Sequence, residues 1–89
     1  MDVLKRIGSA AVIPVVVLDS AEDAVPTARA LLAGGIDVME ITFRTAAGRD
    51  AIAAVASECP EMLVGAGTVL NCAQGREAVG AGAKFIVST

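Results

Sequence analysis

The stretch VMEITFRT, residues 38–45, decides the fold because its apolar and polar side chains alternate. In a β-strand, successive side chains point to opposite faces of the sheet. One face of this strand is apolar and suits a covering layer of helices: Met39, Ile41 and Phe43. The other face is polar: Glu40, Thr42 and Arg44. Burying unpartnered charges beneath helices is costly, so we expect the polar face to line a barrel interior near the C-terminal strand ends, facing a ligand.

Apolar runs of strand length alternate with Ala-rich helical stretches on both sides of this segment. The runs predict strands at Val12–Leu18, Val38–Phe43, Leu63–Ala66 and Phe85–Ser88. Helices are expected over Asp2–Ile7, Glu22–Ala33, Ala47–Cys59 and Ala73–Ala81. The strand centres recur every 22 to 25 residues, roughly the length of one strand-plus-helix unit.

The predicted helix ends carry the usual signals. Asp19 and Ser20 offer N-caps before the helix at Glu22, and Gly34 follows its last residue. The acidic residues near this start are Asp19, Glu22 and Asp23. Their simplest interpretation is capping and a favourable interaction with the helix dipole, rather than metal binding.

Connections between such units are right-handed and produce a parallel sheet. An open doubly wound sheet and a portion of a (β/α)8 barrel both satisfy this pattern, and the polar strand face favours the barrel. Four units in 89 residues are about half of a small barrel. We therefore predict an α/β chain of the TIM-barrel class, with residues 1–89 forming a single domain that covers the first four β/α units.

The composition excludes several classes of function. The chain has no His, which rules out a Ser-His-Asp triad or a His-based zinc site within these residues. Its net charge is −3, and the seven basic residues are scattered. Without a basic stripe to follow a phosphate backbone, we expect no nucleic-acid partner.

Two further patterns bear on location and redox state. The longest strongly apolar stretch, residues 7–18, is interrupted by glycine, serine and proline and falls short of the ~20 residues that span a bilayer. The first residues lack the order of a signal peptide. We expect a soluble, cytoplasmic chain with no membrane partner. Cys59 and Cys72 flank opposite ends of the predicted third strand, so we expect two free thiols.

The segment GAGTVL, residues 65–70, superficially resembles a dinucleotide-binding fingerprint. Leu70 occupies the third glycine position, and Val87 and Ser88 lie where an acidic residue is needed. We therefore exclude nicotinamide binding. The glycines are instead expected to let the backbone turn and pack closely at a strand end.

Glu40 and Arg44 lie four residues apart on one strand face, and their pattern has two interpretations. In the first, the carboxylate transfers protons and the guanidinium binds a carboxylate or phosphate of a substrate. In the second, the two residues form a structural salt bridge at a strand end. The pattern alone leaves both open.

Three segments are distinctive when taken together: AVIPVVVLDSAEDAVPTARALLAGGIDVMEITFRT, VGAGTVLN and AGAKFIVS. They resemble the N-terminal half of the 2-keto-3-deoxy-6-phosphogluconate (KDPG) aldolases, a family that includes the forms acting on 4-hydroxy-2-oxoglutarate (KHG). The resemblance covers residues 10–88, and the spacing of EITFRT and GAGTVLN is quite specific. It implies a (β/α)8 barrel, a trimeric habit, and a class I lyase whose lysine forms a Schiff base with pyruvate, with no metal or other cofactor.

By position, the resemblance implies roles for three residues. Glu40 matches the general acid/base that moves protons during carbinolamine formation and C–C cleavage. Arg44 matches an arginine that lines the same pocket, and Thr68 matches the threonine that binds the pyruvyl carboxylate. The substrate implied is KDPG, cleaved to pyruvate and glyceraldehyde 3-phosphate, or KHG, cleaved to pyruvate and glyoxylate.

The Schiff-base lysine of the family lies on a strand beyond the fourth, and neither Lys5 nor Lys84 matches it. We therefore expect the isolated chain to be inactive. The alternative is a non-catalytic half-barrel that serves as a structural or partner-dependent module. A half-barrel has two open edges, so we also expect self-association or pairing with a missing second half-barrel.

Overall fold

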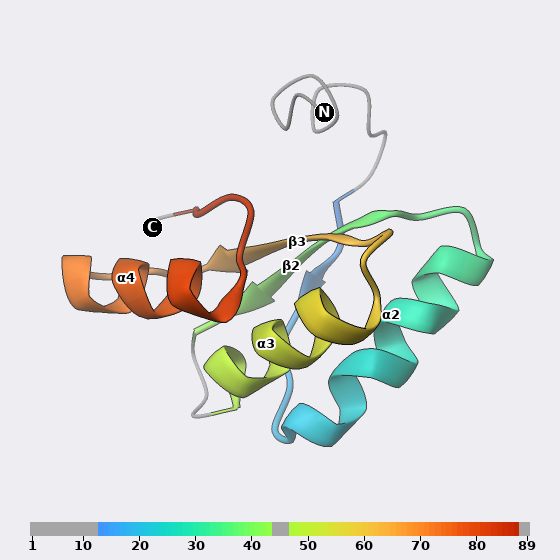
Figure 1. Cartoon of the computed structure of the whole chain (residues 1–89), viewed down its shortest axis with the longest axis horizontal. Helices are drawn as coiled ribbons and strands as arrows, with labels where there is room; N and C mark the ends of the chain where they lie inside the picture. The colour runs from blue at the N-terminus through green and yellow to red at the C-terminus, as the bar shows by residue number, and fades with distance from the viewer. Residues whose placement is uncertain (1–12, 44–46, 88–89) are drawn as a thin grey trace.

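The computed structural model describes residues 13–43 and 47–87 (Figure 1). Over these residues a parallel sheet has the strand order β1, β2, β3, with bounds Val15–Val16, Val38–Thr42 and Leu63–Gly67. The helical elements are η1 (Ala21–Asp23), α2 (Ala24–Ala33), α3 (Gly48–Glu58) and α4 (Cys72–Ala81). The predicted alternation of strands and helices is confirmed, while the predicted helix over Asp2–Ile7 lies outside the described residues.

The helices cover one side of the sheet (Figure 1). Helix α3 lies in the middle of this layer, in contact with α2 on one flank and α4 on the other. A doubly wound sheet carries helices on both faces. The one-sided layer over the described residues therefore favours a barrel segment over the open-sheet alternative.

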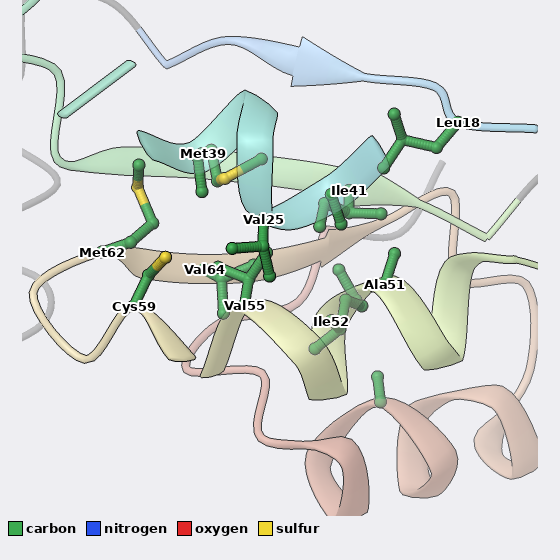
Figure 2. Packing of buried hydrophobic residues seen from close by; sticks show 14 of the residues in the cluster. Leu18, Val25, Met39, Ile41, Ala51, Ile52, Val55, Cys59, Met62 and Val64 are labelled. Atoms are coloured by element: carbon green, nitrogen blue, oxygen red, sulfur yellow. The ribbon is translucent and has the colours of Figure 1, made fainter. Parts of the chain in front are cut away.

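The core fills the space between the sheet and the helices (Figure 2). Met39 and Ile41 of β2 are fully buried there, as their alternation predicted, and Phe43 packs against the same cluster. Ile52 and Val55 of α3 meet them from the helix side. Each such aliphatic side chain contributes about 1.5–3 kcal/mol when fully buried, so this face carries the stability of the fold.

The helix ends are only partly as predicted. The Ser20 hydroxyl accepts a hydrogen bond from the Glu22 backbone N–H at 3.3 Å, but it opens a 3-10 turn, from which α2 continues. Helix α4 begins at Cys72, one residue earlier than expected. Its start is fixed by Asn71, whose side chain accepts from the Gln74 N–H at 2.9 Å. We did not predict this cap.

Both outer strands are shorter than predicted. Regular pairing in β1 is limited to Val15–Val16, although the Pro14 carbonyl just before it accepts a hydrogen bond from the Glu40 N–H at 2.9 Å. The predicted strand Phe85–Ser88 is reduced, among its described residues, to one parallel bridge from Ile86 to Ala66. The hydrogen bond from Val87 N–H to the Ala66 carbonyl, 2.8 Å long, keeps this segment beside β3. Edge strands pair on one side only, so regular pairing ends early there.

Over residues 13–43 and 47–87, no helix is both long enough and apolar enough to cross a bilayer. Cys59 is a buried free thiol and Cys72 an exposed one.

Candidate functional site at the C-terminal ends of two strands

The register of β2 and β3 places the polar face of β2 against glycines. Glu40 lies opposite Gly65, and Thr42 lies opposite Gly67. In a parallel pair, residues in register point to the same side of the sheet. The side chains of Glu40 and Thr42 therefore lie on the face away from the helices, next to two positions with no side chain.

Gly67 makes room for the Glu40 carboxylate. A Cβ atom added at Gly67 would lie 2.8 Å from Glu40 Cγ and 2.5 Å from Cδ, closer than real Cβ contacts allow. A Cβ at Gly65 would instead meet the ring of Phe85. The expectation that these glycines permit close packing is confirmed. The half-buried Glu40 side chain therefore lies over the bare backbone of Gly67, while the Phe85 ring covers Gly65. We call Gly65 and Gly67 of β3 together the glycine floor.

Thr68 directly follows this floor and holds an unusual backbone conformation. Its φ of 56° lies in the left-handed region, whereas neither Gly65 nor Gly67 has a positive φ. The turn at the strand end is thus made by a β-branched residue, not by the glycines as the pattern indicated. Such a conformation costs about 1–2 kcal/mol, and strain of this kind clusters at functional sites.

Thr42, on the same face of β2 as Glu40, has a second unusual feature, a buried hydroxyl. It is 1% exposed, and its hydroxyl oxygen has no hydrogen-bond partner in the structure described for residues 13–43 and 47–87. A buried polar group without a partner costs about 1–3 kcal/mol. The sequence pattern placed Thr42 on this face but did not single it out.

The remaining predicted residues are placed as follows. Arg44 and Lys5 lie outside the described residues, so the two interpretations of the Glu40–Arg44 pair stay open. Lys84 is exposed, and its backbone N–H donates to the carbonyl of Val64 near the start of β3. That position is at the N-terminal end of the sheet, as expected, away from Thr68.

Charged groups elsewhere form no comparable cluster. Arg49 and Asp50 make an exposed ion pair of 3.3 Å at the start of α3, of a kind that contributes little. In the part of the chain that the structure describes, no group of three or more potential metal ligands comes together. Glu22 and Asp23 lie in the first turn of η1, consistent with the dipole interpretation, but the side-chain cap is made by Ser20 and the Asp23 side chain makes no capping hydrogen bond.

An apolar groove that we did not predict lies between α4 and the segment beside β3. Its lining combines one helix face with the segment beside β3: Cys72, Gly75, Arg76, Val79, Gly80 and Ile86. Val79 is 59% exposed and Ile86 41% exposed. The groove depends on Ile86, which is far from most of α4 in sequence and is held beside Ala66 of β3. A local sequence pattern therefore does not predict it.

These features define a class of protein. Parallel β/α units with helices on one side and polar groups at the C-terminal strand ends are the arrangement of a (β/α)8-barrel enzyme site. The chain belongs to the family "Aldolase: KDPG and KHG aldolase", whose model matches residues 3–89.

Individual relatives agree with this assignment. A 2-dehydro-3-deoxy-phosphogluconate aldolase of Treponema pallidum is 58% identical over 77 residues, which are 86% of this chain and 37% of that protein. The KDPG aldolase structure from Zymomonas mobilis ATCC 29191 has a TM-score of 0.88 and 43% identity, over 99% of this chain and 42% of that one. The KDPG aldolase of Legionella pneumophila, with pyruvate captured as a covalent carbinolamine, has a TM-score of 0.82 and 46% identity, over 85% and 37%. The chain thus spans about two fifths of the length of these relatives.

Proposed function

We propose that this chain supplies the N-terminal half of a class I aldolase barrel, which cleaves KDPG to pyruvate and glyceraldehyde 3-phosphate or KHG to pyruvate and glyoxylate. The observation that carries this proposal is the Glu40 carboxylate lying over the glycine floor of β3, beside the strained Thr68. The carbinolamine in the Legionella pneumophila relative supports the imine chemistry. We place the reaction in the cytoplasm as part of the same proposal.

The proposed chemistry assigns a separate task to each group. A lysine amine attacks the 2-keto carbon, and loss of water from the carbinolamine leaves an imine. The imine accepts the electron pair of the breaking C3–C4 bond as the aldehyde leaves. Glu40 takes the proton of the C4 hydroxyl in this step and returns a proton to the enamine carbon. Arg44 and Thr68 hold the anionic keto acid, because their donors suit carboxylate oxygens.

The attacking lysine is not one of the two in this sequence. Lys84 lies at the opposite end of the sheet from Thr68, and Lys5 precedes the first strand. We therefore propose that residues 1–89 act as one domain, and that they need the remaining barrel units for turnover. Imine chemistry requires no metal or other cofactor.

A chimera tests this function. Residues 1–89 would replace the matching segment of the Zymomonas mobilis KDPG aldolase, which aligns with 99% of this chain. We expect the chimera to cleave KDPG or KHG and to form a borohydride-trapped pyruvate adduct, visible as a mass increase. Glu40→Gln should lower kcat by at least about a hundredfold, within the range for general acid–base groups. A folded chimera that traps no pyruvate would refute the proposal.

The open edges of the sheet support a second proposal, on partners. Val15 at the β1 edge and Val87 at the other edge are 59% and 38% exposed. Unpaired strand edges with apolar side chains favour pairing with another chain. We propose that these edges join either a second copy of this chain or a separate second half-barrel. This assembly is also the form in which the alternative function, a non-catalytic module, would operate.

A further inference from the structure

Thr42 occupies a position next to the proposed acid/base that neither the fold nor the proposed roles explain. Its hydroxyl is fully buried and lacks a partner within the described residues. Native structures rarely leave such a group unpaired, and each instance needs a physical explanation. A valine would fill the same volume without this cost, so the hydroxyl itself needs a reason.

The neighbourhood of Thr42 points to the Glu40 carboxylate. The two residues share one face of β2, two positions apart. Glu40 does not stand over its own register partner, Gly65, because the ring of Phe85 covers that residue. Its carboxylate instead reaches along the strand to Gly67, the register partner of Thr42. The carboxylate is thereby shifted toward the threonine.

The bare backbone of Gly67 lies between the Glu40 carboxylate and Thr42 on the neighbouring strand. Neighbouring strands lie about 4.8 Å apart, and Gly67 contributes no side chain between the carboxylate above it and the Thr42 hydroxyl beside it. The Glu40 carboxylate over Gly67 and the Thr42 hydroxyl thus lie next to each other on the same face of the sheet. A hydrogen bond from a hydroxyl to a carboxylate is stronger than one between neutral groups, and it would satisfy the buried donor.

We infer that Thr42 is a positioning residue: its hydroxyl donates a hydrogen bond to the Glu40 carboxylate and fixes it over Gly67. Glu40 touches the substrate, and Thr42 acts through it. The inference rests on the proposed function for its catalytic meaning. The hydrogen bond itself can be tested in the 89-residue chain, without turnover.

The test is a double-mutant cycle measured by urea unfolding of the isolated chain. Thr42→Val removes the hydroxyl at constant shape, and Glu40→Met removes the acceptor oxygens at similar length. We expect Thr42→Val to raise the unfolding equilibrium constant about tenfold, as for a hydrogen bond to a charged group. The same change should have little effect in the Glu40→Met background. Thr42→Ser should retain most of the coupling, because it keeps the donor.

A matched control is Thr27→Val in α2. The Thr27 hydroxyl donates to the Asp23 carbonyl at 2.7 Å, in the helix layer on the other side of the sheet. Its effect should be the same with Glu40 or Met at position 40. If Thr42→Val instead stabilises the chain equally in both backgrounds, the hydroxyl is an unpaired group and the inference is overturned.

A second measurement needs no Thr42 variant and so does not depend on how such a variant folds. The Thr42 hydroxyl proton should exchange slowly and resonate downfield in proton NMR spectra of the chain, and Glu40→Met should move or abolish this signal. A spectrum that Glu40→Met leaves unchanged would refute the hydrogen bond.

In the active chimera, Thr42→Val should lower kcat at least fivefold with KM nearly unchanged, and Thr42→Ser should restore most of it. An inactive parent chimera with an intact coupling in the isolated chain would refute the proposed function alone. An active chimera that is insensitive to Thr42→Val would refute the positioning role alone.

Discussion

The two faces of strands β2 and β3 differ in almost every physical respect. The face toward the helices carries close-packed aliphatic side chains, with Met39, Ile41 and Val64 fully buried (Figure 2). Toward the C-terminal ends of the strands, the opposite face carries a carboxylate, a buried hydroxyl and two glycines, followed by the strained Thr68, beyond the buried pair Val38 and Leu63. The helix-facing side therefore stabilises the fold through buried apolar side chains. The polar and strained groups on the other side lower the free energy of unfolding.

The largest effect is expected from truncating the helix-facing side. Ile41→Ala removes buried methyl groups between β2 and α3, and should lower the free energy of unfolding by about 2–5 kcal/mol. Small domains have only about 5–15 kcal/mol in total, so this variant should be close to unfolded in urea titrations at 25 °C. Val15→Ala, at a residue 59% exposed on the other face, is the control. Equal losses from the two variants would contradict the contrast between the faces.

Adding one carbon to the glycine floor should separate packing from chemistry. Gly65→Ala forces the Phe85 ring aside and should cost about 1–3 kcal/mol of stability, as overpacking does. Gly67→Ala displaces the Glu40 side chain from its Cγ outward, and this side chain is flexible. It should cost less stability, yet in the chimera it should lower kcat more than tenfold.

Gly80→Ala provides the control for both glycine variants. Gly80 lies in α4, and an added Cβ meets nothing within 4 Å. The substitution should stabilise the chain by up to about 1 kcal/mol through helix propensity. If Gly67→Ala leaves kcat at the parent value, the glycine floor is not part of the site.

The exposed edges of the sheet should show as self-association. We expect sedimentation equilibrium at micromolar loading to show species heavier than 8.9 kDa. Val15→Lys should weaken this association at least tenfold, or about 1.4 kcal/mol, by placing a charge on the β1 edge. The control is Arg29→Lys, at an exposed residue of α2, which keeps the charge and should leave the self-association unchanged. A single 8.9 kDa species at all concentrations would exclude self-association and leave the second half-barrel as the proposed partner.

The smallest effect is expected at Thr68, where a substitution should stabilise the chain rather than destabilise it. Thr68→Gly relieves the left-handed strain and should raise the free energy of unfolding by about 1 kcal/mol. In the chimera it should raise KM for the keto acid, because the hydroxyl is lost. Thr68→Asn, which tolerates this conformation and keeps a polar group, should lose less affinity. A destabilised Thr68→Gly chain would show that the strain argument is wrong.

The sequence by itself determined the parallel β/α order and the side of β2 that packs against the helices. Periodicity of two in residues 38–43 is a local property, and a strand converts it directly into two faces. The family followed from motifs that are also local. The ends of the outer strands were mispredicted, because pairing at an edge depends on neighbours that no local pattern describes.

Only the tertiary structure decided how the site is built. The register of β2 against β3 brings Glu40 over Gly67, and the segment at Phe85 closes the space above Gly65. The positive φ falls on Thr68 rather than on a glycine, against intrinsic preference. The first two of these results come from contacts between residues 27 and 20 positions apart, Glu40 with Gly67 and Gly65 with Phe85. At such separations, packing outweighs the local preferences that a sequence pattern can express.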